Sequence, residues 1–296
     1  MKITLTGSLG HISQPLTIEL VQKGHIVTVI SSKPEKQKDI EALGAIAAIG
    51  TMEDADFLTK TFSGADAVYT MVAGGNFFTP DFDLIAYGDK ISNNYAQAVQ
   101  QSGVKRVVHL SSIGAHLEKG TGLIQMHRQA EGILNNLKDV AVTFMRPVGF
   151  NYNLFVFVGG IKATGRMSSN YGANDVIPWA SPIDIATAIA KEITTPLTGK
   201  KVQYVASEEL TCNEVAGILG AAIGKPDLRW SLITDEQLQS RYESFAMNKI
   251  IAAGLVEMQA NMHNGPFYED YYLHRPTLGK VKMKDFAKEF AIVYNQ

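Results

Sequence analysis

The chain has 296 residues, a formal net charge of -2, and an ordinary balance of 46% hydrophobic and 19% charged residues. It is long enough for one large core or two domains, and its charge gives no reason to expect a nucleic acid or an anionic membrane as partner. The single cysteine, Cys212, excludes an internal disulfide bond and a cysteine-rich zinc site. The N-terminus lacks a signal-peptide pattern and the apolar runs are too short to cross a bilayer, so we expect a cytoplasmic protein.

Apolar runs and helical patterns alternate through the first half of the chain, with glycines between them. Strands are expected at residues 2–6, 25–30, 44–50, 65–72, 104–112 and 140–147. Helices are expected at residues 14–24, 35–43, 53–64, 83–103 and 123–137. The strands are continuous apolar runs, which is typical of strands with both faces covered. The alternation therefore predicts an α/β fold with a doubly wound parallel sheet of the Rossmann type.

The second half of the chain has a different character. Residues 151–179 are rich in glycine, asparagine and aromatic residues, and we expect them to be loop-like. A helix, a strand and a second helix are then expected at residues 181–196, 200–207 and 211–226, before a mostly helical remainder. We therefore expect a dinucleotide-binding domain at residues 1–150 and a smaller α/β region at residues 151–296 that binds the substrate. This region should lie over the carboxyl edge of the sheet and be partly interleaved with it.

The stretch TGSLGHIS joins the first strand to the first helix. Such a turn directs backbone N–H groups and the positive end of a helix to one point, where a phosphate fits. Gly7 permits a tight turn, Gly10 lets the backbone approach a pyrophosphate, and Ser13 replaces the usual third small residue. A bare turn with two glycines is the alternative. The residues expected to bind the dinucleotide are Gly7, Leu9, Gly10, His11 and Ile12.

The end of the second strand indicates which dinucleotide is bound. An acidic side chain there would bind a ribose 2′-hydroxyl and repel a 2′-phosphate. This chain has no carboxylate between Ile30 and Pro34, and it offers the hydroxyl groups of Ser31 and Ser32 and the charge of Lys33. The sequence therefore favours NADP(H), with NAD(H) as the alternative. The lysine also fits an ordinary solvated loop.

Five blocks of the sequence resemble one family. They are TGSLGHIS, GADAVYTMV, SGVKRVVHLSSIGAH, TFMRPVGFNYNL and IPWASPIDIATAIA, and the resemblance covers nearly the whole chain. They resemble the NmrA-like group of atypical short-chain dehydrogenases/reductases, with Ser13 as the departure from its TGxxGxxG loop. The resemblance implies a Rossmann fold and an NAD(P)H cofactor. Members of the group reduce quinones, dyes or phenylpropanoids, or bind the cofactor as regulators that turn nothing over.

The resemblance also implies which residues line the cofactor beyond the glycine loop. The backbone from Pro147 to Phe150 is expected at the nicotinamide. Further cofactor contacts are expected after the fourth and fifth strands and on the fifth helix, at Met71, Val72, Ala73, Ser111 and His127. Phe150, Tyr152 and Asn153 would then lie over the nicotinamide, where aromatic rings suit a flat, apolar substrate. The alternative is that these rings only fill the domain boundary.

The usual proton donor of short-chain reductases is absent from the sequence. That donor is the tyrosine of a YxxxK pair, whose lysine lowers the pKa of the phenol. None of the 11 tyrosines has a lysine four residues later. Matching Glu131 to the glutamate that follows the lysine in such proteins puts Leu123 at the tyrosine position and His127 at the lysine position. His127 can donate a hydrogen bond and, near neutral pH, a proton, and is either a catalytic contact or a structural histidine on a helix face.

Two further side chains are candidates for the reaction. Ser112 follows the fifth strand, where open α/β sheets bind ligands, and we expect it to orient the substrate or the cofactor. His116 is a candidate donor, with a place in a surface loop as the alternative. The chain carries no HExxH, GxSxG or P-loop pattern, so neither a metal site nor a hydrolase is expected.

These features together predict an NADPH-dependent reductase that moves hydride to a small apolar acceptor, such as a quinone or a related carbonyl compound. Quinone reduction can take its protons from solvent, so the missing tyrosine is less damaging than it would be for a ketone. The alternative is a non-catalytic NADP(H) sensor that acts through a protein partner. The sequence is also compatible with a homodimer.

Overall fold

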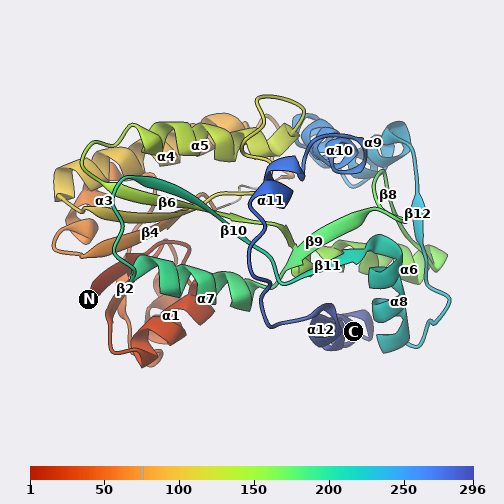
Figure 1. The fold of residues 1–296 in the computed structure, drawn as a ribbon, viewed down its shortest axis with the longest axis horizontal. Helices are drawn as coiled ribbons and strands as arrows, with labels where there is room; N and C mark the ends of the chain where they lie inside the picture. Colours follow the sequence, from red (N-terminus) through yellow and green to blue (C-terminus); the bar gives the residue numbers. More distant parts are fainter. Residues whose placement is uncertain (74, 76) are drawn as a thin grey trace.

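The computed structural model describes residues 1–73, 75 and 77–296. Figure 1 shows two parts side by side: a sheet between layers of helices, which carries the N-terminus, and a smaller group of helices and short strands, which carries the C-terminus. The chain passes between the two parts more than once, because α7 (Pro182–Ile193) and β10 (Lys200–Val205) return to the first part. The predicted interleaving is therefore confirmed.

The central sheet has seven strands in the order β10-β6-β5-β4-β1-β2-β3, and each neighbouring pair is parallel. The strands besides β10 are β1 (Lys2–Leu5), β2 (Ile26–Ser31), β3 (Ile46–Ile49), β4 (Ala67–Met71), β5 (Arg106–Leu110) and β6 (Ala141–Pro147). The strand order reverses between β1 and β4, so their carboxyl ends border the crevice in which open α/β sheets bind ligands. The predicted doubly wound parallel sheet is confirmed.

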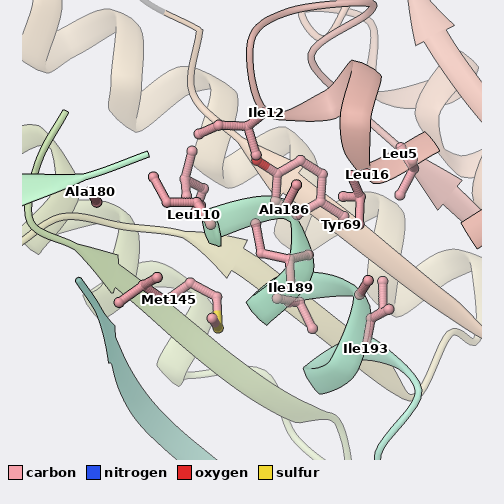
Figure 2. Packing of buried hydrophobic residues seen from close by; sticks show 14 of the residues in the cluster. Leu5, Ile12, Leu16, Tyr69, Leu110, Met145, Ala180, Ala186, Ile189 and Ile193 are labelled. Carbon is pink, nitrogen blue, oxygen red and sulfur yellow. The ribbon is translucent and has the colours of Figure 1, made fainter. Parts of the chain in front are cut away.

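Helices cover both faces of the central sheet (Figure 1). The helices of this part besides α7 are α1 (Ser13–Gln22), α2 (Gln37–Ala42), α3 (Ala55–Phe62), α4 (Leu84–Ser102) and α5 (Gln125–Asn135). α1 and α7 pack against each other on one face, and α3, α4 and α5 form the layer on the other. Figure 2 shows Leu16, Ile189 and Ile193 of the first layer close to Leu5 and Tyr69 of the sheet. All five are buried, and each buried leucine or isoleucine stabilises the fold by about 1.5–3 kcal/mol.

The smaller part is built around short strands. β7 (Gly149–Phe150), β9 (Val176–Ala180) and β11 (Glu208–Thr211) form one sheet, and β8 (Met167–Ser169) pairs with β12 (Trp230–Leu232). Its helices are α6 (Val158–Thr164), α8 (Cys212–Ala222), α9 (Asp235–Ser244), α10 (Lys249–Asn264), α11 (Glu269–Leu273) and α12 (Met283–Tyr294). A separate hydrophobic cluster, with Leu219 and Phe290 among its buried members, holds α6, α8, α12, β8, β9 and β12 together.

The expectation that residues 151–179 are loop-like is wrong. The segment contains the 3-10 helix η3 (Asn151–Phe157), α6, β8 and most of β9. Its glycines mark the turns between these elements: Gly165 ends α6 with φ 72, and Gly172 follows β8 with φ 124. The apolar residues between the turns are buried in the second core, as Ile161 and Trp179 show.

Some predicted helices begin with a tighter turn than expected. The helix expected at residues 35–43 is divided into the 3-10 helix η1 (Pro34–Lys36) and α2. The helix expected at residues 123–137 is likewise divided into η2 (Gly122–Ile124) and α5. Within the described residues, no helix is long and apolar enough to cross a membrane.

Candidate active site

The glycine loop between β1 and α1 is packed so tightly that only glycine fits at its first position. Gly7 has φ 90, a backbone conformation that L side chains rarely adopt. A Cβ atom on Gly7 would lie 2.6 Å from Met71 Sδ and 2.6 Å from Ser13 Oγ. The loop is also tied to β4, since Met71 N donates to Thr6 Oγ1 at 3.0 Å. The loop therefore lies at the carboxyl ends of both β1 and β4.

The side chain of Ser13, which stands at the position of the motif's third small residue, lies beside Gly7. Its side chain is buried, and its Oγ donates to the Thr6 carbonyl at 3.0 Å. One turn further along α1, Thr17 Oγ1 donates to the Ser13 carbonyl at 2.7 Å. The extra hydroxyl group is thus hydrogen-bonded inside the turn and does not project toward a ligand.

The start of α1 leaves backbone donors without partners. The amides of His11, Ile12 and Ser13 donate to no acceptor in the part of the chain that the structure describes. No side chain caps α1, and its first turn carries no acidic residue. In contrast, the carboxylates of Asp54 and Asp83 cap α3 and α4. Free amides at a helix N-terminus attract anions, so the loop fits the pyrophosphate of a dinucleotide.

The other residues of the loop differ in exposure. Gly10 and His11 are exposed, Leu9 is half-buried against the sheet core, and Ile12 is buried. Gly10 N donates to the Gly7 carbonyl at 3.1 Å, and a Cβ atom on Gly10 would lie 3.2 Å from that carbonyl oxygen. The exposed residues therefore form the surface of the loop, while Leu9 and Ile12 anchor it.

The residues at the end of β2 have unequal roles. Ser31 is buried, and its Oγ accepts from Ser8 Oγ at 2.9 Å and from Lys33 N at 3.2 Å, so this hydroxyl group links two loops. Ser32 and Lys33 are exposed, and Lys33 forms no ion pair within the described residues. Lys36 does form one, with Asp39 at 2.9 Å. Ser32 and Lys33 are thus the groups free to contact a ribose phosphate.

The end of β4 continues this edge of the site. The Met71 carbonyl accepts from Tyr95 Oη at 2.8 Å, which fixes the strand end against α4. The side chain of Met71 stands over Gly7, Val72 is buried, and Ala73 is half-buried. The structure therefore places Met71 beside the glycine loop, whereas Val72 packs into the core on the α4 side of the sheet.

A buried ion-pair network connects β5, α5 and β6. Ser111 Oγ donates to Glu131 Oε1 at 2.5 Å, and Arg146 donates to both oxygens of Glu131 at 2.8 and 2.6 Å. Arg146 also pairs with Asp270 of α11 at 3.2 Å, and Tyr204 of β10 donates to the same carboxylate. No role for Arg146 was expected from the sequence. A lone arginine in an otherwise apolar strand indicates a buried carboxylate partner.

The tyrosine position of the usual catalytic pair is filled by a packed leucine. Leu123 lies in η2, against α10: a Cβ atom on Gly254 would be 2.7 Å from Leu123 Cδ2. The neighbouring Gly122 approaches α10 even more closely, since a Cβ atom there would lie 1.8 Å from the Gly254 carbonyl oxygen. Leu123 therefore packs against α10 and cannot supply a proton.

His127 is neutral at physiological pH. Burial lowers its pKa to about 4, although the Glu131 carboxylate acts in the opposite direction. Its Nδ1 atom has no hydrogen-bond partner within the described residues, and a charge on His127 would lower the pKa of the buried His109. His127 can exchange hydrogen bonds with a ligand, and its lowered pKa argues against proton transfer from an imidazolium near neutral pH, because burial penalises the charged form.

The two other candidate residues near α5 are Ser112 and His116, and each has a side-chain group without a hydrogen-bond partner within the described residues. Ser112 is half-buried, and its hydroxyl group has no partner within the described residues. Burial lowers the pKa of His116, whose Nδ1 also lacks a partner in the described part of the chain. The His116 carbonyl accepts from Arg128 Nη1 at 2.9 Å, so its backbone is held to α5.

The aromatic residues after β6 connect to the glycine loop. The rings of Phe150 and Tyr152 lie 5.2 Å apart, and Tyr152 stacks on His11 with 4.7 Å between ring centroids and 25° between planes. Asn153 is exposed. Pro147 ends β6, and its carbonyl accepts from Ile113 N at 3.0 Å. The structure therefore brings the predicted substrate rings and the glycine loop together.

Half-buried hydrophobic side chains from several elements pack against one core cluster. They pack against the core cluster that includes Leu110, Ile113 and Val148, at the ends of β5 and β6. We call them the apolar wall, which consists of Leu117, Ile124, Phe150, Met258, Met262 and Tyr268. Because α10 contributes Met258 and Met262, the wall joins the smaller part of the molecule to the core of the larger part.

Residues 7–196 match the model of a family described as NAD(P)H-binding. The chain belongs to this NAD(P)H-binding family. The matched residues begin at the glycine loop and include every strand of the central sheet from β2 to β6. The predicted NAD(P)H cofactor is therefore confirmed.

Solved structures share the fold of this NAD(P)H-binding protein over almost its whole length. An NADPH-dependent quinone oxidoreductase from Escherichia coli, in complex with NADPH, has 18% sequence identity and a TM-score of 0.80, with 97% of this chain and 99% of that chain covered. Triphenylmethane reductase from Citrobacter sp., in complex with NADP(H), has 18% identity and a TM-score of 0.75, with 98% and 99% covered. A curated ketoreductase from Stigmatella aurantiaca is 25% identical over 126 residues, which cover 43% of this chain and 37% of that protein.

Proposed function

We propose that this protein is an NADPH-dependent reductase that transfers hydride to a small apolar acceptor such as a quinone. The apolar wall carries the proposal, because a flat, uncharged acceptor needs apolar surface beside the edge where the cofactor binds. The quinone oxidoreductase and the dye reductase with the same fold support an acceptor of this kind. We further propose that residues 1–150 hold the cofactor and residues 151–296 supply most of the substrate side.

The proposed mechanism assigns positions to this chain's own groups. When bound, NADPH supplies the hydride. The free amides at the start of α1 hold its pyrophosphate, and Ser32 and Lys33 hold its 2′-phosphate. Ser112 and neutral His127 orient the nicotinamide ribose or the acceptor oxygen by hydrogen bonds. The apolar wall excludes water from one side of the acceptor.

The proposed hydride transfer suits an acceptor that needs no proton donor from the protein. One hydride delivers two electrons and one proton to a quinone, and the hydroquinone anion then takes its second proton from water. A simple ketone would instead need a donor at its oxygen during transfer. Leu123 cannot donate, and His127 is uncharged at neutral pH. The proposal therefore favours quinones over simple ketones.

The direct test is NADPH oxidation with a panel of benzoquinone, menadione and other naphthoquinones, with an aliphatic ketone as comparison. We expect turnover with at least one quinone and little with the ketone. Met258→Gln should raise the KM for the quinone about tenfold, because a polar amide replaces part of the apolar wall. Glu257→Gln, an exposed neighbour on α10, is the matched control and should leave the KM unchanged.

The same experiment addresses the alternative of a cofactor sensor. NADPH binding without turnover of any acceptor, together with a specific co-purifying protein partner, would contradict the reductase proposal and support the sensor. Turnover whose KM is the same in wild type and Met258→Gln would support a reductase but contradict the placement of the acceptor.

A further inference from the structure

A cavity of about 340 Å³ lies beside the glycine loop, on the α1 and α7 side of the sheet. Its walls come from the first two turns of α1, η3, the start of α7, the segment before α12 and α12 itself. It therefore lies between the two parts of the molecule, and neither the apolar wall nor the residues at the ends of β4 and β5 line it. The proposed reductase mechanism gives it no role.

Most of the cavity surface is apolar and partly aromatic. Phe155 and Phe286 line it, with 5.1 Å between their ring centroids, and Ile183 lines it although its side chain is 51% exposed. Flat surfaces of this kind suit a planar ring.

One buried polar side chain in the cavity lacks partners. Asn151 lines the cavity and is 6% exposed, and its Oδ1 atom is buried without a hydrogen-bond partner in the described part of the chain. Its Nδ2 atom likewise donates to no described residue. A buried carboxamide without hydrogen bonds costs about 1–3 kcal/mol, so its retention indicates a missing partner. A carboxamide presents a donor and an acceptor side by side, and the complementary group is another amide edge.

The cavity walls are held in place without a ligand. Asp184 of α7 accepts from Lys280 N at 3.1 Å, from Val281 N at 3.0 Å and from Ser207 Oγ at 2.6 Å. These bonds fix the segment before α12 to the start of α7. The site is therefore largely pre-formed, as small-molecule sites usually are.

The cavity also touches the cofactor loop. His11 and Tyr152 both line it, and they stack on each other with 4.7 Å between centroids. The His11 amide is one of the three in this loop that donate to no acceptor within the described residues. A ligand that packs on Tyr152 therefore supports the loop in the conformation that presents those amides.

We propose that this cavity is an effector site for a small planar molecule with an amide or lactam edge, held by Asn151 between aromatic and aliphatic walls. Occupancy strengthens NADPH binding through the stack of Tyr152 on His11, and NADPH strengthens effector binding by the same factor. The coupling rests on the proposed role of the glycine loop, whereas effector binding itself does not.

Benzamide is the test ligand for the site, with acetophenone as a matched compound that lacks the N–H donors. By saturation-transfer NMR and calorimetry, we expect benzamide to bind with a dissociation constant of about 1 mM or below, and acetophenone about tenfold more weakly. Asn151→Leu should weaken benzamide binding at least about tenfold, and Ile183→Trp, which fills the mouth, should do the same. Asn135→Leu, an exposed position on α5 outside the cavity, is the control and should bind benzamide as wild type does.

Two outcomes would overturn the site. One is equal benzamide affinity in wild type, Asn151→Leu and Ile183→Trp, with all three proteins folded by circular dichroism. The other is complete displacement of benzamide by NADPH, which would make the cavity part of the cofactor site. For the coupling, saturating benzamide should lower the NADPH dissociation constant about fivefold, and an unchanged constant would contradict it. NADPH titration without benzamide tests the cofactor loop separately, so the two failures can be distinguished.

Discussion

Two polar regions at the carboxyl edge of the sheet differ in whether their hydrogen-bonding groups have partners within the protein. In the glycine loop, the amides of His11, Ile12 and Ser13 have no acceptor within the described residues. In the ion-pair network, Glu131 and Arg146 satisfy each other and also bind Ser111, Tyr204 and Asp270, as given above. The regions are separated only by the ends of β4 and β5.

This difference in hydrogen bonding indicates that the glycine loop binds a ligand, whereas the ion-pair network stabilises the fold. Unpaired donors at an accessible loop are available to a ligand. Leaving them unpaired within the protein costs little free energy, because water can accept their hydrogen bonds. A buried ion pair must be fully satisfied, because one charge left alone costs several kcal/mol. We therefore expect mutations in the loop to change the affinity for the cofactor, and mutations in the network to change the free energy of unfolding.

The largest expected effect comes from breaking the network. Glu131→Leu leaves the Arg146 guanidinium without its main partner in a site where the two side chains are only 9% and 12% exposed. We expect a loss of about 3–5 kcal/mol in the free energy of unfolding, measured by urea denaturation. Asp39→Asn, which breaks the exposed pair with Lys36, should cost less than about 1 kcal/mol. Similar losses in the two variants would contradict the contrast.

The sequence predicted the loop much better than the network. The loop is local: its glycines, the preceding strand and the following helix lie within one short stretch, so their pattern indicates the geometry directly. The network joins Glu131, Arg146, Tyr204 and Asp270, which are far apart in the chain, and no local pattern identifies such partners. For the same reason, residues 151–179 were expected to be loop-like: composition indicated their turns, whereas the tertiary contacts that order Ile161 and Trp179 were not visible in the sequence.

The next effect concerns pH. His109 and His127 have pKa values lowered by burial to about 3 and about 4, against 6.5 in the unfolded chain. The unfolded state therefore binds more protons below pH 6.5, and stability is fully present above that value and lost as the pH falls. Each histidine should contribute a slope of about 1.4 kcal/mol per pH unit between pH 6.5 and its own folded pKa. His127→Gln should flatten the stability profile between pH 6.5 and 5 by about that slope, and an unchanged profile would show that His127 is not buried as a neutral ring.

A smaller change is expected at the edge of the cofactor loop. Lys33→Ala removes the unpaired cation after β2, and should raise the dissociation constant for NADPH about tenfold while leaving that for NADH unchanged. Lys36→Ala removes a lysine that is already paired with Asp39, and is the control. Parallel titrations with the two nucleotides measure both. Equal weakening of NADPH and NADH would contradict the assignment of Lys33 to the 2′-phosphate.

The smallest expected effect is at Ser13. Ser13→Ala removes the hydrogen bond to the Thr6 carbonyl and should cost about 1 kcal/mol in stability, since the bond is buried. NADPH affinity should change less than about twofold, because the hydroxyl group points into the turn. A large loss of affinity with little loss of stability would show that Ser13 contacts the cofactor.

The most direct measurement of the central claim is calorimetric titration of NADPH into wild type, Gly10→Leu and Gly159→Leu. Gly10 is exposed on the loop and has no positive φ, and a side chain there would press on the Gly7 carbonyl oxygen, 3.2 Å from the Cβ position, and cover the surface above the free amides. Gly159 is an exposed glycine of α6 with open space around it, and serves as the matched control. We predict that Gly159→Leu binds NADPH as wild type does and that Gly10→Leu binds at least about a hundredfold more weakly. A folded Gly10→Leu protein that binds NADPH within a few-fold of wild type would contradict the claim that this loop holds the pyrophosphate.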